Sequence, residues 1–149
     1  MTFKVVRPWL VRWMYLMAFI HFVGGLLLPW VANATLFDSY HQSVLQSFWP
    51  EQVPSAGRAL QVWWLGLFGA TLQNVAIFMG VLIYVADRQR AVFVWGWMVI
   101  GFLVWAPQDI WISLQADAWM HVMGDAIALL LMLPPLLVLF FGDKKMKVG

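Results

Sequence analysis

Four long apolar stretches divide the chain, and most of its polar residues lie between them. The stretches run at about residues 9–31, 59–86, 91–113 and 118–141. Each is long enough to cross a hydrocarbon core of about 30 Å as a helix that rises about 1.5 Å per residue. A strand in lipid would leave backbone groups unpaired, and four segments are too few to close a barrel. Residues 1–149 therefore predict a single all-α, polytopic membrane domain, an antiparallel bundle of four transmembrane helices.

The connections between the stretches are unequal. Residues 87–90 and 114–117 are tight turns, so the second, third and fourth spans are expected to be antiparallel neighbours. The first connection, residues 32–58, is long enough for structure of its own. Its apolar residues recur at helical spacing from Leu36 to Trp49, and Pro50 and Pro54 follow. This pattern predicts a short amphipathic helix that lies on the membrane surface or caps the bundle.

The distribution of charge predicts the orientation. Hydrophobic residues make up 63% of the chain and charged residues 11%, where soluble domains have about 25% charged residues. Of the nine Lys and Arg residues, only Arg58 falls in the first long connection, and the other eight flank the opposite ends of the spans. By the positive-inside rule, both termini are cytoplasmic and residues 32–58 form an outer loop. We expect a multi-pass protein of the cell (inner) membrane, with the lipid bilayer as its surroundings and no nucleic-acid partner.

Eleven tryptophans and a set of small residues indicate how the helices sit and pack. Most of the tryptophans fall near span ends, where their rings anchor helices at the headgroup level. Trp95, Trp97 and Trp105 lie deeper, and we expect them to pack between helices. Small or polar residues mark the faces where helices in lipid approach closely. The second span carries Gly66, Gly69, Gln73, Ala76 and Gly80, and the first carries Ala18, His21 and Gly25.

Ionisable residues inside the spans indicate a candidate site. Such a residue costs about 2.5–3.5 kcal/mol on insertion scales and usually marks a site. His121 and Asp125 lie four residues apart, on one face of the fourth helix. Asp109 lies near the outer end of the third span, which a tight turn brings close to His121. These three residues are predicted to meet in an outward-facing polar pocket.

Three interpretations of this cluster remain open. His121 and Asp125 either satisfy each other and fix the helix register, or bind a small ligand or proton, or contribute to a metal site. For a metal, the candidate ligands are His121, Asp125 and the loop residue His41. His21, Gln73 and Asn74 either form an interhelical hydrogen bond or line the floor of the same pocket.

Known catalytic motifs do not point to an activity. The chain has no cysteine, and it lacks a zincin pair, a nucleophile-elbow serine and a phosphate-binding glycine loop. A conventional hydrolase or transferase is therefore not expected, and the sequence assigns neither catalytic residues nor a cofactor.

The length of the chain, its four spans, the Gly24-Gly25 pair and the short second and third connections resemble the small bacterial DoxX-like membrane proteins. That resemblance implies a four-helix membrane protein, often accessory to redox or stress systems, and carries over no site residue. The leading hypothesis is a polar pocket for a small ligand or proton. The alternatives are a non-catalytic accessory or scaffold subunit, with a membrane-protein partner or as a homo-oligomer, and a membrane enzyme that acts on a lipid or quinone.

Overall fold

The computed structural model describes residues 2–148 and confirms the predicted all-α fold. Four helices are long and apolar enough to cross a membrane, as expected for a multi-pass membrane protein. They are α1 (Phe3–Val31), α3 (Gly57–Arg88), α4 (Val92–Gln115) and α5 (Trp119–Val148). The predicted amphipathic helix is α2 (Asp38–Phe48), which follows a short 3-10 helix, η1 (Thr35–Phe37). The four long helices overlap the four predicted stretches, and α1 and α5 continue as helices into their basic flanks.

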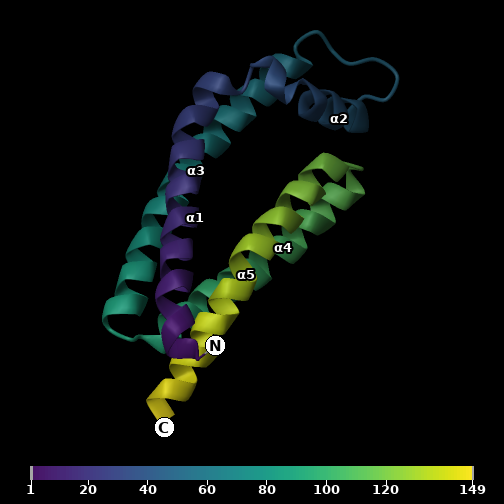
Figure 1. The fold of residues 1–149 in the computed structure, drawn as a ribbon. Coiled ribbons are helices and arrows are strands. Elements are labelled where there is room, and N and C mark those ends of the chain that lie inside the picture. Colours follow the sequence, from purple (N-terminus) through teal and green to yellow (C-terminus); the bar gives the residue numbers. More distant parts are fainter. Residues whose placement is uncertain (1, 149) are drawn as a thin grey trace.

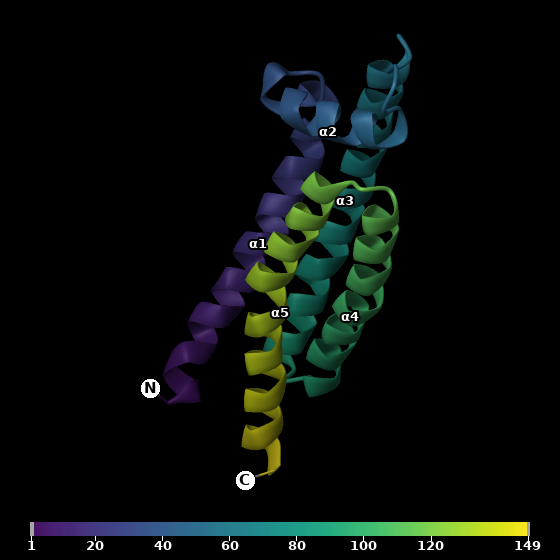
Figure 2. The same cartoon turned by 90° about the vertical axis from the view of Figure 1, so that its right-hand side faces the viewer.

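The four long helices form two antiparallel pairs, α1 with α3 and α4 with α5 (Figure 1). Both termini lie at one end of the molecule, which we call the termini end, and α2 lies at the other, the α2 end (Figures 1 and 2). The pairs approach each other at the termini end and diverge toward the α2 end (Figure 1). Contacts between the pairs run from α1 to α5 and from α3 to α4.

A close glycine contact holds α1 against α3. A methyl group built at Gly25 would lie 2.6 Å from the carbonyl oxygen of Gly69, and one built at Gly69 would lie 2.8 Å from that of Gly25. Only hydrogen fits at either position. The side-chain amide of Gln73 donates across the same seam to the carbonyl oxygen of Gly25, at 3.1 Å. The predicted small-residue faces therefore meet here.

The main core lies between the pairs toward the termini end. Its largest fully buried side chain is Trp95, which packs with Met14, Ile83 and Leu136. The expectation that Trp97 also packs between helices is wrong, because its side chain is 66% exposed. Residues 95 and 97 point to opposite faces of a helix with about 3.6 residues per turn, so they cannot share one interior face.

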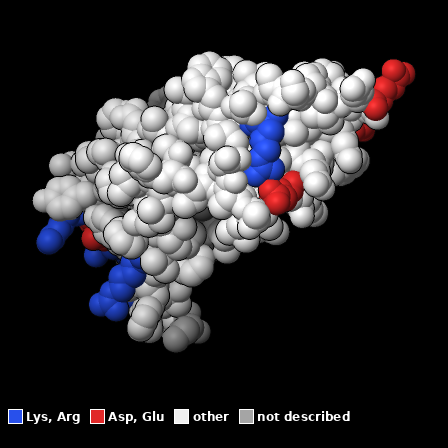
Figure 3. All heavy atoms as spheres, turned by 90° about the horizontal axis from the view of Figure 1, so that it is seen from above, with Lys and Arg blue, Asp and Glu red and all other residues white. Residues whose placement is uncertain are grey.

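Helix α2 connects the two pairs at the α2 end. It lies between α1 and α3 in the chain, yet it also contacts α5, and the Ser47 hydroxyl donates to the carbonyl oxygen of Asp117 in the α4–α5 turn. Arg58 at the start of α3 pairs with Asp38 of α2 at 2.8 Å. Seen from this end, charged atoms are sparse on a mostly uncharged surface (Figure 3). Helix α2 thus acts as the predicted cap.

Candidate functional site

The candidate site is built where α4 ends and α5 begins. Residues 116–118 connect the two helices, and Asp117 adopts a positive φ of 52°, a conformation that aspartate tolerates better than most residues. This tight turn places Asp109, within the last two turns of α4, beside the first turns of α5. His121 and Asp125 are one helical turn apart on α5, so both face Asp109.

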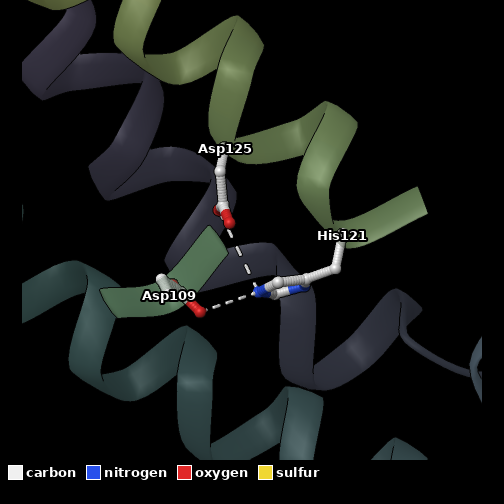
Figure 4. Close-up of side chains that lie close together, drawn as sticks. All are labelled: Asp109, His121 and Asp125. Atoms are coloured by element: carbon white, nitrogen blue, oxygen red, sulfur yellow. Dashed lines mark ion pairs between the residues drawn. The ribbon is translucent and has the colours of Figure 1, made fainter. Parts of the chain in front are cut away.

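The three side chains converge on one point (Figure 4). The Nε2 atom of His121 lies 3.4 Å from Oδ1 of Asp109 and 4.0 Å from Oδ1 of Asp125. One nitrogen or oxygen from each residue lies within 4.8 Å of the others. Asp109 and His121 are partly exposed, whereas Asp125 is only 6% exposed. The cluster is therefore reached from the surface and has a buried carboxylate at its inner side.

The negative charge of this cluster has little compensation. Among the described residues, neither Asp109 nor Asp125 forms an ion pair with Lys or Arg, and His121 is the basic group beside both. The Oδ2 atom of Asp125 is buried and has no hydrogen-bond partner among those residues. Buried polar atoms usually have a partner, because leaving one without costs about 1–3 kcal/mol. The cluster thus holds two carboxylates, and the buried one, Asp125, has an oxygen without a hydrogen-bond partner among the described residues.

Tyr40 completes the site from α2, and sequence reasoning missed it. Its hydroxyl lies 3.3 Å from Nδ1 of His121, on the opposite side of the ring from the carboxylates. Burial raises the pKa of Tyr40 above its usual value, and the negative charges of Asp125 and Asp109 raise it further. The phenol therefore stays protonated well into the alkaline range. The amphipathic pattern predicted α2, but not that α2 docks on the other helix pair.

The other predicted site residues lie elsewhere. His41 is fully buried and donates from Nε2 to the carbonyl oxygen of Ala32 at 2.7 Å, so it is not a member of the cluster. His21 donates from Nδ1 to the carbonyl oxygen of Met17, one turn back in its own helix. Gln73 makes the interhelical hydrogen bond described above. Asn74 is exposed on α3.

A surface cavity of about 610 Å³ lies near the candidate site, at the α2 end. The turn residue Asp117 is part of its wall, together with one face of α2. That wall does not include Asp109, His121 or Asp125. The cavity is polar and open, and it lies between α2 and the α4–α5 turn, outside the cluster itself.

A second polar cluster, at the termini end, was not predicted from the sequence. The Arg7 guanidinium binds both oxygens of Asp143, at 2.7 and 2.9 Å, and pairs with Asp87 at 2.5 Å. The indole N–H of Trp95 donates to Asp143 at 3.1 Å, and Arg90 lies 3.6 Å from the same carboxylate. Arg7 and Asp143 are both buried.

These termini-end residues come from α1, the α3–α4 region and α5, so the cluster fastens all four long helices together. Its charges are paired and hydrogen-bonded. We therefore interpret it as structural. One feature of the sequence could have indicated this cluster: Asp87 and Asp143 are acidic residues in otherwise basic flanks of the spans.

Comparisons with known proteins do not assign the chain to a family. No family model matches the sequence, and neither a curated protein nor a solved structure matches it. The function must therefore be argued from the site itself.

Proposed function

We propose that this small multi-pass protein binds a small cationic ligand, a proton included, at the cluster of Asp109, His121 and Asp125. The observation that carries the proposal is the buried Asp125, whose Oδ2 atom lacks a hydrogen-bond partner among the described residues. Two carboxylates near one imidazole form a site that favours positive charge, and because no Lys or Arg among residues 2–148 pairs with them, that charge is left to a ligand.

We further propose that the protein lies in the inner membrane with the α2 end outside. Eight of the nine Lys and Arg residues flank the other ends of the spans, which supports cytoplasmic termini. In that orientation the ligand arrives from outside the cell. The partial exposure of Asp109 and His121 at the α2 end agrees with such a route.

Thermal unfolding in mild detergent tests the proposal. Wild type, Asp125→Asn and the control Asp117→Asn are compared in buffers that contain sodium, potassium, magnesium, calcium or zinc, and from about pH 5 to about pH 8. We expect at least one cation, or the proton, to raise the Tm of wild type and of the control by roughly 5 °C, and to leave Asp125→Asn unchanged.

Two results would contradict the proposal. In one, all three proteins respond alike to every cation and to pH. In the other, wild type purifies with a stoichiometric protein partner that is lost in Asp125→Asn, which would favour an accessory subunit. Asp117 is an exposed aspartate in the adjoining turn, so its variant separates the loss of a surface charge from the loss of the site.

A further inference from the structure

We propose that Asp109, His121 and Asp125 bind a divalent transition-metal ion with the ligand preferences of zinc. This inference rests on the cation site proposed above and names its ion. The ligand set is one imidazole nitrogen and two carboxylate oxygens, contributed by two helices. Zinc is commonly held by nitrogen and oxygen ligands of these kinds, with three from the protein and a fourth position left to water or a substrate.

The distances from His121 to the two carboxylates are compatible with a tetrahedral ion. Zinc bonds of about 2.0–2.1 Å at tetrahedral angles separate neighbouring ligand atoms by roughly 3.3 Å. Nε2 of His121 and Oδ1 of Asp109 are already 3.4 Å apart. The 4.0 Å separation between Nε2 and Oδ1 of Asp125 is somewhat longer. Rotation of the carboxylates about their terminal bonds, which have broad energy minima, can close that difference.

The orientation of Asp125 is an independent indication of a ligand. Its carboxylate points toward the His121 ring (Figure 4). The residue is 6% exposed, and its Oδ2 atom has no hydrogen-bond partner among the described residues. A metal ion between the three side chains would bind this carboxylate, through Oδ1 or, after rotation of the carboxylate, through Oδ2, and would neutralise both negative charges. A purely structural pair would leave the oxygen unsatisfied.

Tyr40 supplies the support that a metal-bound histidine needs. A ligating imidazole usually directs its other ring nitrogen to a hydrogen-bond partner, which fixes its tautomer and its orientation. Nδ1 of His121 has the Tyr40 hydroxyl at 3.3 Å, while Nε2 faces the carboxylates. With a metal on Nε2, the Nδ1–H group donates to the phenol oxygen. Tyr40 is thus a positioning residue, and an ion would link α2 to the α4–α5 pair.

The same ligand set argues against magnesium and calcium as preferred ions. Both take oxygen ligands, six for magnesium and six to eight for calcium, and neither favours imidazole. This cluster offers two carboxylates and one ring nitrogen. Nitrogen with a small number of oxygens is typical of zinc and its neighbours among the transition metals.

The test is a zinc titration of tag-free, chelator-treated protein in mild detergent, followed by competition with a fluorescent zinc chelator. We expect one zinc ion per wild-type chain. His121→Ala and Asp125→Asn should weaken binding by roughly a hundredfold, and Tyr40→Phe by about tenfold. His21→Ala is the matched control, because that histidine makes its hydrogen bond within α1, and it should bind zinc as wild type does.

Wild type that binds no zinc would overturn the inference, as would equal binding by the His121 and Asp125 variants. If zinc does not bind, but another cation raises the Tm of wild type and not that of Asp125→Asn, the proposed function stands and the inference of a zinc-like site falls. If no cation and no pH change has an Asp125-dependent effect, both fall. If a ligand variant does not fold, the comparison of wild type with Tyr40→Phe still tests the zinc site, because Tyr40→Phe retains every metal ligand and is expected only to weaken zinc binding.

Discussion

At the scale of single residues, Tyr40 joins the amphipathic cap to the polar cluster. Its hydroxyl is partnered with His121, and the same burial and negative charges that raise its pKa keep it in the hydrogen-bonding, neutral form. An ionised phenol would be a third negative charge beside two carboxylates. The fold therefore favours protonated Tyr40 over the ionised form more strongly than the unfolded chain does.

We predict that Tyr40→Phe lowers the stability of the protein at neutral pH. We also predict that the variant loses less stability than wild type when the pH is raised. Without the hydrogen bond, the variant should be less stable by about 0.5–1.5 kcal/mol near pH 8. The folded-state pKa is raised, so this contribution of Tyr40 is complete below the unfolded pKa of about 10 and is lost as the pH rises toward the folded value. The difference between the two proteins should therefore shrink as the pH increases from about 8 to about 11.

The measurement is chemical or thermal unfolding of both proteins across that range. Tyr84→Phe, which changes an exposed tyrosine on α3, is the control for loss of a phenol elsewhere. If the stability of Tyr40→Phe falls in parallel with that of wild type at every pH, then Tyr40 does not titrate later in the folded state than in the unfolded chain.

At the scale of elements, the α1–α3 pair depends on the close approach of the two backbones. A comparison of the adjacent Gly24 and Gly25 separates the cost of steric overlap from the gain in helix propensity. A methyl group at Gly25 would meet the carbonyl oxygen of Gly69 at 2.6 Å and the amide nitrogen of Gln73 at 2.9 Å. A methyl group at Gly24 would meet nothing within 4 Å. Both positions lie in the same turn of α1, so an alanine gains the same helix propensity at each.

We predict that Gly25→Ala destabilises the protein and Gly24→Ala does not. Steric overlap with backbone atoms forces the helices apart, at a cost of about 1–3 kcal/mol, whereas the exposed position gains up to about 1 kcal/mol from helix propensity. Unfolding of the two variants in the same detergent measures the difference. Equal stability of the two variants would mean that α1 and α3 do not pack through Gly25.

The elements were also the part of the structure that the sequence predicted best. Apolar length determined the spans, and the helical period placed His121 beside Asp125. The tight turn at residues 116–118 then brought Asp109 to them. These relations are local in the chain. Tyr40 joins the cluster from 81 residues away, and Arg7 meets Asp143 from 136 residues away, so both contacts depend on how whole helices dock and no local pattern encodes them.

At the scale of the whole molecule, the termini end is where the two helix pairs are fastened. Arg7 of α1 binds Asp143 of α5 with two hydrogen bonds and Asp87 of α3 with a third, and Trp95 of α4 donates to Asp143. Toward the α2 end the pairs diverge, and α2 links them there (Figure 1). The relative position of the pairs, and hence the setting of the candidate site, rests on these two connections together with the apolar core between the pairs.

We predict that Arg7 and Asp143 are strongly coupled. Arg7→Met alone leaves a buried carboxylate without its main partner, and Asp143→Leu leaves a buried guanidinium, so each should cost about 3–5 kcal/mol. The double variant removes both charges and should be clearly more stable than the sum of the two losses implies, by several kcal/mol in a double-mutant cycle. Arg12→Met, at an exposed position one and a half turns after Arg7 on α1, is the control and should cost no more than about 1 kcal/mol, the scale of its cation–π contact with Trp9. Additive losses in the cycle would mean that the buried ion pair does not fasten α1 to α5, and the close approach of the two helix pairs at the termini end would then rest on the apolar core alone.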